Sequence, residues 1–232
     1  MPLPQFIRAN RIHLAGSIAS VSPGSTPAGL SVMGPALGGA LSPTGPATAP
    51  TSGVAAPPVV HALAFTMQVQ EETNWCWAAV AVSTGHFYAA AGGVPTQCHL
   101  ATAELAGKGV GVCCPARVNP ACDIPWYLHT ALVRLGRYHG YLATAANYAS
   151  QLVPQIAAGR PVAFRIDWGA GTGHFVMVSG YDQTGGSQIV TVDDPAPATS
   201  GGLSPQRHIM DYATFTSAYL GTGSVSDTLW TI

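Results

Sequence analysis

The sequence has little charge. Lysine and arginine together number 9, and aspartate and glutamate number 10, in a chain of 232 residues, which gives a formal net charge of -1 at pH 7. No segment gathers basic side chains into a cluster. Because proteins that bind nucleic acids neutralise phosphates with clustered lysine and arginine, we expect no nucleic-acid partner.

Long hydrophobic runs are also absent. The mean hydropathy is +0.26, but small alanine, glycine and valine residues account for much of it. The longest uninterrupted apolar run, Trp75 to Val82, is far shorter than the roughly 20 residues that a membrane-spanning helix requires. We therefore expect a soluble protein with no membrane partner.

The N-terminal part lacks the residues that build a core. Residues 17–58 contain neither a charged nor an aromatic side chain and are dominated by Ala, Gly, Pro, Ser and Thr. Such a composition cannot offset the entropy of ordering the chain. We expect residues 1–58 to form a disordered segment, a candidate removable leader, and residues 59–232 to form one domain. The first sixteen residues lack the apolar stretch of a standard secretory signal.

Cysteine is scarce, and the five cysteines divide into one and four. Cys76 stands apart in the sequence. The clustered cysteines are Cys98, Cys113, Cys114 and Cys122. If these four pair as two disulfides, Cys76 is the remaining free thiol, and the protein matures in an oxidising compartment, which predicts secretion or export. Two alternatives stay open, namely four reduced buried cysteines and a zinc site that includes His99.

Hydrophobic periodicity predicts helices first and strands afterwards. The expected helices cover residues 75–90, 97–106, 126–135 and 148–158. The expected strands cover residues 162–166, 174–181, 188–193, 207–210 and 228–232. Thr73 or Asn74 is expected to cap the first helix, and Pro154 makes the start of the last one irregular. This order predicts an α+β architecture with two packed halves and a cleft where they meet.

Cys76 is expected in the first turn of the first helix. Unpaired backbone N–H groups and the positive end of the helix macrodipole favour a thiolate at such a position. Gln70 lies six residues upstream, and its amide, aimed with the Cys76 N–H at one point, would stabilise the oxyanion of a tetrahedral intermediate. The structural alternatives are an inert buried cysteine and an ordinary surface glutamine.

His174 opens a predicted strand directly after the glycine-rich run 169–173, which leaves room for a substrate backbone. Asp193 and Asp194 end the next predicted strand. If the two strands pair, one carboxylate can accept a hydrogen bond from the imidazole and fix its tautomer. We favour Asp194 over Asp193 for this role. The structural alternative is a hydrated turn.

Three motifs carry a resemblance to a known family: QEETNWCWAA over 70–79, GHFVMVSGYD over 173–182 and VDDP over 192–195. They resemble the papain-like cysteine peptidases of the bacteriocin-processing (C39-like) and AvrRpt2 types, over about residues 59–232. The resemblance implies a papain-like fold, with Cys76 on the central helix of a helical half and His174 and Asp194 on an antiparallel sheet. It also implies Gln70 as oxyanion donor, a protein or peptide substrate, and no cofactor or metal.

The same resemblance suggests a secreted effector or toxin-like protease. Effector members remove their own N-terminal extension, and residues 35–39, PALGG, are similar to their cleavage site. Two other functions stay open, because the same three residues can catalyse acyl transfer or deamidation, and an inactive domain can serve binding alone. The sequence leaves open the target and whether a partner activates the enzyme.

Overall fold

The computed structural model describes residues 57–89, 93–169, 171–198 and 204–232. These residues belong to one compact unit of the chain. The expectations for residues 1–56, including the processing motif at 35–39, lie outside the described residues. No helix within the described ranges is both long and apolar enough to cross a membrane.

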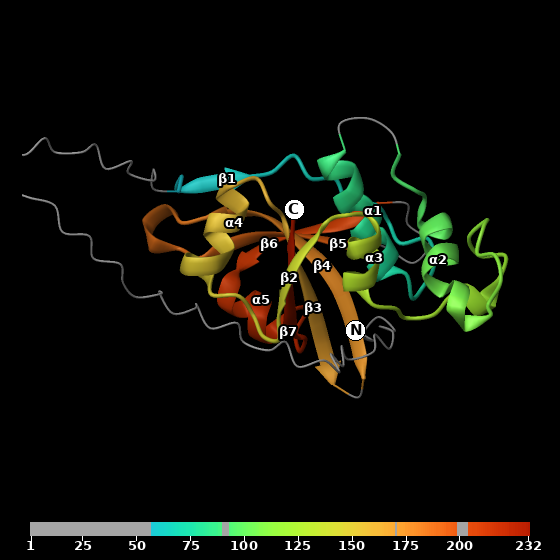
Figure 1. Ribbon diagram of the computed structural model, residues 1–232. Helices are drawn as coiled ribbons and strands as arrows, with labels where there is room; N and C mark the ends of the chain where they lie inside the picture. Colours follow the sequence, from blue (N-terminus) through green and yellow to red (C-terminus); the bar gives the residue numbers. More distant parts are fainter. Residues whose placement is uncertain (1–56, 90–92, 170, 199–203) are drawn as a thin grey trace, which may run out of the picture. The chain divides into compact units, whose positions relative to one another are not determined.

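A seven-stranded sheet forms the centre of the fold (Figure 1), and every neighbouring pair of its strands is antiparallel. In spatial order the strands are β2 (Tyr138–Leu142), β7 (Ser224–Thr231), β3 (Val162–Gly169), β4 (Thr172–Asp182), β5 (Ile189–Pro197) and β6 (Pro205–Asp211). The short strand β1 (Val60–Ala62) pairs with the end of β4. The strands expected in the second half of the domain are therefore confirmed.

Helices cover both faces of this sheet (Figure 1). One face packs against α1 (Cys76–Tyr88) and α3 (Leu128–Arg134), and α2 (Gln97–Leu105) packs against α1. The other face packs against a π-helical turn (Tyr148–Leu152), α4 (Val153–Ala157) and α5 (Tyr212–Ala218). The expected α+β class is confirmed, and the irregular start expected near Pro154 is the π-helical turn.

Strand alternation divides the hydrophobic side chains between two cores. Ala163, Phe175 and Met177 belong to the core on the α1 side. Phe164 and Val176 belong to the core on the α5 side. Because successive residues of a strand point to opposite faces, β3 and β4 are buried on both sides and read as nearly continuous hydrophobic runs.

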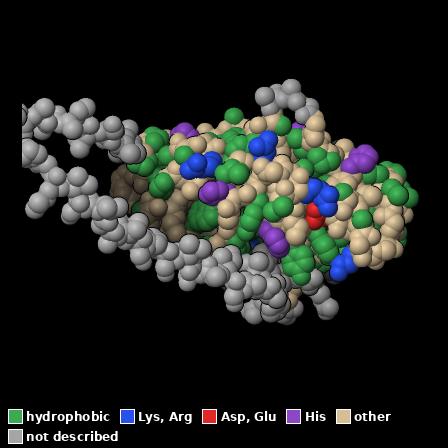
Figure 2. Space-filling model, viewed as in Figure 1, with side chains coloured by type: hydrophobic (Ala, Val, Ile, Leu, Met, Phe, Trp, Pro, Cys, Tyr) green, Lys and Arg blue, Asp and Glu red, His purple; other side chains and the backbone are tan. Residues whose placement is uncertain are grey.

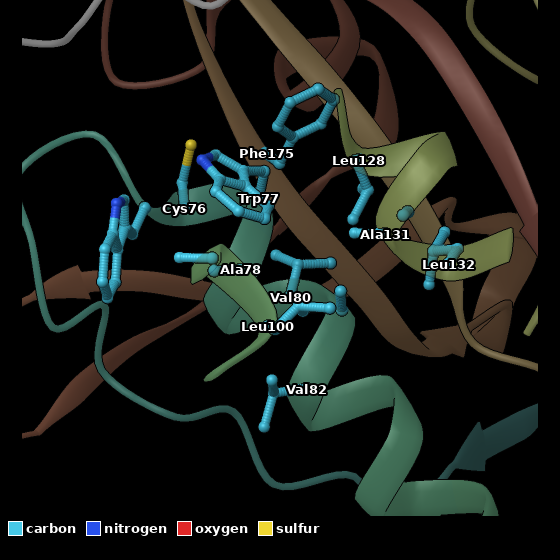
Figure 3. Packing of buried hydrophobic residues seen from close by; sticks show 14 of the residues in the cluster. Cys76, Trp77, Ala78, Val80, Val82, Leu100, Leu128, Ala131, Leu132 and Phe175 are labelled. Carbon is cyan, nitrogen blue, oxygen red and sulfur yellow. The ribbon is translucent and has the colours of Figure 1, made fainter. Parts of the chain in front are cut away.

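The central helix α1 is buried from Cys76 to Gly85. A helix with apolar residues all round is typical of a core position. Figure 3 shows Trp77 beside Cys76 at the start of α1, with Phe175 of β4 close by. The cap predicted at Thr73 or Asn74 is wrong, because Trp75 holds the N-cap position without a side-chain cap. Asn74 instead donates two hydrogen bonds to Asp123, from its backbone N–H to Oδ1 and from its Nδ2 to the backbone carbonyl.

Strand β2 was not predicted from the sequence. It is a five-residue strand, and its register shifts between Tyr138 and Gly140. Among the described strands it pairs with β7 alone, and it keeps partial exposure along its length. A short, irregular and half-exposed edge strand lacks the alternation by which strands are recognised.

The four clustered cysteines form two disulfides, Cys98–Cys114 and Cys113–Cys122. Cys76 is the free cysteine, as expected from the odd count. Cys98, His99 and Cys114 are the one group of three potential metal ligands that comes together among the described residues. Two of those sulfurs are joined to each other, so the zinc alternative does not fit this arrangement.

The surface reflects the low charge of the sequence. Figure 2 shows basic and histidine side chains scattered among hydrophobic and neutral atoms on the face in view. Among the described residues, the large hydrophobic side chains left exposed are Val59, Val60, Val112, Val118, Val133, Ile209 and Ile232.

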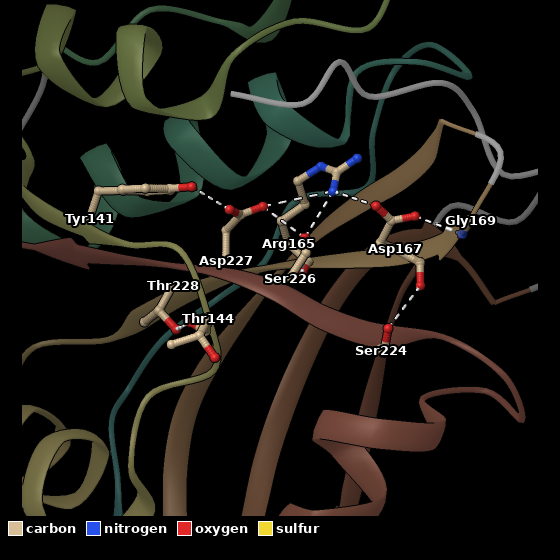
Figure 4. Close-up of polar contacts among 9 residues, drawn as sticks. All are labelled: Tyr141, Thr144, Arg165, Asp167, Gly169, Ser224, Ser226, Asp227 and Thr228. Atoms are coloured by element: carbon tan, nitrogen blue, oxygen red, sulfur yellow. Dashed lines mark hydrogen bonds and ion pairs between the residues drawn. The ribbon is translucent and has the colours of Figure 1, made fainter. Parts of the chain in front are cut away.

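A buried cation lies on β3, on the face that packs against α1. Arg165 is 0% exposed, and its Nη1 donates to Asp167 Oδ2 at 3.0 Å and to Ser226 Oγ at 2.8 Å (Figure 4). Asp227 Oδ2 lies 3.7 Å from the same nitrogen. Two carboxylates thus offset the cost of burying the guanidinium.

The Arg165 guanidinium lies directly against Gly173 of β4. A Cβ added at Gly173 would fall 2.5 Å from Nη2 and 2.8 Å from Cζ of Arg165. Only glycine therefore fits at the residue that precedes His174 without moving the buried cation.

We expect Gly173→Ala to lower the free energy of unfolding by about 1–3 kcal/mol, the usual cost of overpacking a buried position. Gly107→Ala is the matched control, because a Cβ there would meet nothing within 4 Å. Urea unfolding of both variants measures the difference. Equal stability of the two variants would contradict the close packing of Gly173 on Arg165.

Candidate active site

Three elements bring the predicted catalytic side chains together. Cys76 is the first residue of α1, His174 lies on β4 and Asp194 lies on β5. His174 Nε2 lies 2.6 Å from Asp194 Oδ1, and the Cys76 thiol is near enough to the imidazole to raise its pKa. Their exposures are 3%, 2% and 0% in chain order. The structure thus brings Cys76 and Asp194 next to the same buried imidazole, that of His174.

The electrostatics of His174 follow from its neighbours. Burial alone would lower the pKa of His174, but the charge and hydrogen bond of Asp194, followed by Cys76, raise it to about 10. Burial alone would raise the pKa of Asp194, but His174 and two further hydrogen-bond donors hold it below its usual value. The imidazolium and the carboxylate therefore coexist at neutral pH.

The two adjacent aspartates have different partners. Asp194 contacts His174, whereas Asp193 accepts hydrogen bonds from the Ser179 hydroxyl and from Arg207 Nε, the latter at 2.7 Å. Neighbouring residues of a strand point to opposite faces, which separates the two carboxylates. The geometry thus selects Asp194 as the partner of the imidazole.

Three further groups lie around this pair, from Tyr219, Trp168 and Ala196. Tyr219, which directly follows α5, donates its hydroxyl to Asp194 Oδ2 at 2.6 Å. The indole of Trp168 lies 6.5 Å from the His174 ring between centroids. The Ala196 N–H donates to Asp194 Oδ1 at 2.7 Å. The contact of Tyr219 with Asp194 depends on how α5 packs against the sheet. No local sequence pattern predicts that packing.

Gln70 lies in the loop that leads into α1. Its backbone N–H donates to Pro195 O at 2.9 Å, which links this loop to the segment after Asp194. Its Nε2 donates to Thr73 O at 2.6 Å and to Glu72 O at 3.0 Å. Both amide hydrogens are therefore directed at carbonyls of the same loop in this structure.

The disulfide-linked segment supports the loop before the nucleophile. Trp75 Nε1 donates to Cys122 O at 2.7 Å, and Trp77 Nε1 donates to Ile124 O at 3.3 Å. Cys122 is itself tied to Cys113. Tryptophans on both sides of Cys76 are thus anchored to one cross-linked stretch of backbone.

We expect Asp194→Asn to bring the pKa of His174 below its ordinary value. Burial lowers this pKa, and in the variant only the weaker effect of Cys76 would oppose it. In the wild type, the stability gained from protonated His174 is complete below the ordinary histidine pKa and is lost as the pH rises through about 10. The variant lacks this contribution.

NMR titration of the His174 ring, assigned with a His174→Gln variant, measures the change. Asp193→Asn is the matched control and leaves the titration in place, because Asp193 contacts Ser179 and Arg207. A His174 titration that Asp194→Asn leaves unaltered would show that the pair does not control the imidazole.

Residues 62–227 match the model of the "Peptidase_C39 like family". The chain is similar to xylellain, a cysteine protease from Xylella fastidiosa, with 16% identity, a TM-score of 0.47, and coverage of 79% of this chain and 90% of that one. It is also similar to digestive procathepsin L 3 of the Tenebrio molitor larval midgut, with 13% identity, a TM-score of 0.49, and coverage of 78% and 72%. Among curated proteins, none matches significantly. The family match spans well over half of the sequence, so the chain belongs to the Peptidase_C39 like family.

Proposed function

We propose that this cysteine peptidase hydrolyses peptide bonds with Cys76 as nucleophile, His174 as general base and acid, and Asp194 as the residue that orients the histidine. One observation carries the proposal: the buried imidazole is hydrogen-bonded to the Asp194 carboxylate and lies close enough to the Cys76 thiol for that group to raise its pKa. This is the relation that nucleophile, base and orienting group require.

The first half of the reaction forms an acyl-enzyme. The Cys76 thiolate attacks the peptide carbonyl carbon and forms a C–S bond, and the carbonyl oxygen takes the negative charge. The tetrahedral intermediate then collapses, the C–N bond breaks, and His174 gives its proton to the leaving amine. The raised pKa of His174 supports an imidazolium as the resting form.

The second half releases the product. His174, now neutral, removes a proton from water, and the resulting hydroxide attacks the thioester carbon. The C–S bond breaks, the carboxylic acid leaves, and the thiolate–imidazolium pair is restored. Asp194 keeps one tautomer of the imidazole through its bond to Nε2, so the other ring nitrogen serves both proton transfers.

An oxyanion site at the start of α1 belongs to the proposal. The Cys76 N–H is at the first helical position, where backbone donors have no acceptor within the helix. Gln70 is the proposed second donor. For this role its amide must turn from the carbonyls of Glu72 and Thr73 toward the substrate.

We extend the proposal to where the enzyme acts. The two disulfides support maturation in an oxidising compartment, as expected of a secreted or exported protein. The proposed substrate is an extracellular or host protein or peptide, in keeping with a secreted effector or toxin-like protease.

We expect the wild type to cleave members of a diverse peptide mixture and Cys76→Ala to cleave none, as read by mass spectrometry. Two fragments from one peptide identify hydrolysis. A gain of about one mass unit at glutamine without chain scission would instead identify a deamidase. Unchanged peptides, together with a Cys76 thiol that iodoacetamide does not label, would favour a binding domain.

We expect Gln70→Ala to lower kcat by about 10²-fold, the usual loss when one oxyanion donor is removed. The rate at which iodoacetamide alkylates Cys76 is the control, because alkylation passes through no oxyanion. A donor role predicts slow turnover with normal alkylation. Parallel loss of both rates would show that Gln70 only shapes its loop.

A further inference from the structure

Tyr219 completes the hydrogen bonding of the buried carboxylate. Asp194 Oδ1 accepts from His174 Nε2 at 2.6 Å and from the Ala196 N–H at 2.7 Å. Asp194 Oδ2 accepts from the Tyr219 hydroxyl at 2.6 Å. A carboxylate with donors on both oxygens cannot rotate about its χ2 angle without breaking at least one of these bonds.

The Tyr219 ring is held from several directions. It packs edge-on against Phe215 and against His208, each with a centroid distance of 5.8 Å, and lies 6.3 Å from Trp168. Its own backbone exchanges two hydrogen bonds with Gly223, at 2.7 and 2.9 Å. The side chain is 0% exposed. The hydroxyl is therefore fixed by packing that does not depend on Asp194.

The turn after Tyr219 is equally constrained. A Cβ at Gly223 would fall 2.6 Å from Ile166 Cγ2 and 2.7 Å from Trp168 Cε2. Trp168 also lies beside His174. The turn after Tyr219 thus packs closely against β3, the strand that pairs with the His174 strand β4.

The protonation state of Tyr219 is also fixed. Burial, followed by the charge of Asp194, raises the pKa of this phenol far above its ordinary value. A phenol that stays protonated can only donate to the carboxylate. Tyr219 is in turn among the groups that hold the pKa of Asp194 below its usual value against the effect of burial.

We propose that Tyr219 is a positioning residue of the active site, which fixes the Asp194 carboxylate toward His174 through its hydrogen bond to Oδ2. This inference rests on the proposed function for its catalytic meaning. Its direct effect falls on the thiolate–imidazolium pair, which can be observed without any substrate.

The experiment follows the rate of Cys76 alkylation by iodoacetamide against pH, together with kcat on a cleaved peptide. We expect Tyr219→Phe to move the acid limb of the alkylation profile to higher pH, because the carboxylate loses a donor and is protonated more readily. We also expect kcat to fall on the order of 10-fold while KM changes little.

Tyr212→Phe is the matched control. Tyr212 is also buried in the core on the α5 side and donates its hydroxyl to Ala146 O, away from the catalytic groups. Its variant should keep the wild-type acid limb. If Tyr219→Phe also keeps that limb and both variants lose only stability, the positioning role is overturned.

A second variant covers the case in which Tyr219→Phe does not fold. Replacement of Tyr219 by 3-fluorotyrosine keeps the shape and makes the phenol a stronger donor. The acid limb should then move to lower pH, opposite to the expected effect of Tyr219→Phe. An unmoved limb would overturn the proposal.

Other titratable groups face this site and require one more control. They are Cys76 from α1, His174 from β4 and His208 from β6. The acid-limb shift should persist when Tyr219→Phe is made in a His208→Asn background. Its disappearance there would assign the shift to His208 and overturn the inference.

Failure of the proposed function can be told apart from failure of this inference. A wild type that cleaves no peptide but alkylates at Cys76 with the expected pH profile removes the peptidase proposal. The comparison of acid limbs still decides the role of Tyr219.

Discussion

The hydrogen bond between His174 and Asp194 is the constraint on which the site depends. Both groups are removed from water, so each charge must be offset by its partner and by further donors. Ala196 and Tyr219 supply those donors to the carboxylate. The sheet holds the pair in place because β4 and β5 are adjacent and antiparallel. Without the carboxylate, a buried imidazole would be neutral and would not support a thiolate.

Strand alternation gives the doubled aspartate two separate uses. Asp194 serves the imidazole on the α5 side of the sheet, in line with Val190 and Val192 of the core there. Asp193 binds Ser179 and Arg207 instead. A one-residue slip of β5 would exchange the two carboxylates, so the register of this strand is part of the chemistry.

The sequence predicted those features of the site that depend on local position along the chain. The helix whose first turn holds Cys76, the strand that carries His174 and the acidic end of the next strand all follow from local pattern. The sequence did not predict those contacts that depend on tertiary packing. The contact of Tyr219 depends on how α5 returns to the sheet. The disulfide pairing is one of three possibilities for four cysteines, and only the fold selects it.

The disulfides have a consequence for the cellular chemistry of the enzyme. Many thiol enzymes gain activity from strong reductants, but here the backbone that anchors Trp75 and Trp77 is itself held by the Cys113–Cys122 cross-link. A reductant strong enough to open that cross-link would protect the nucleophile from oxidation while loosening its supports.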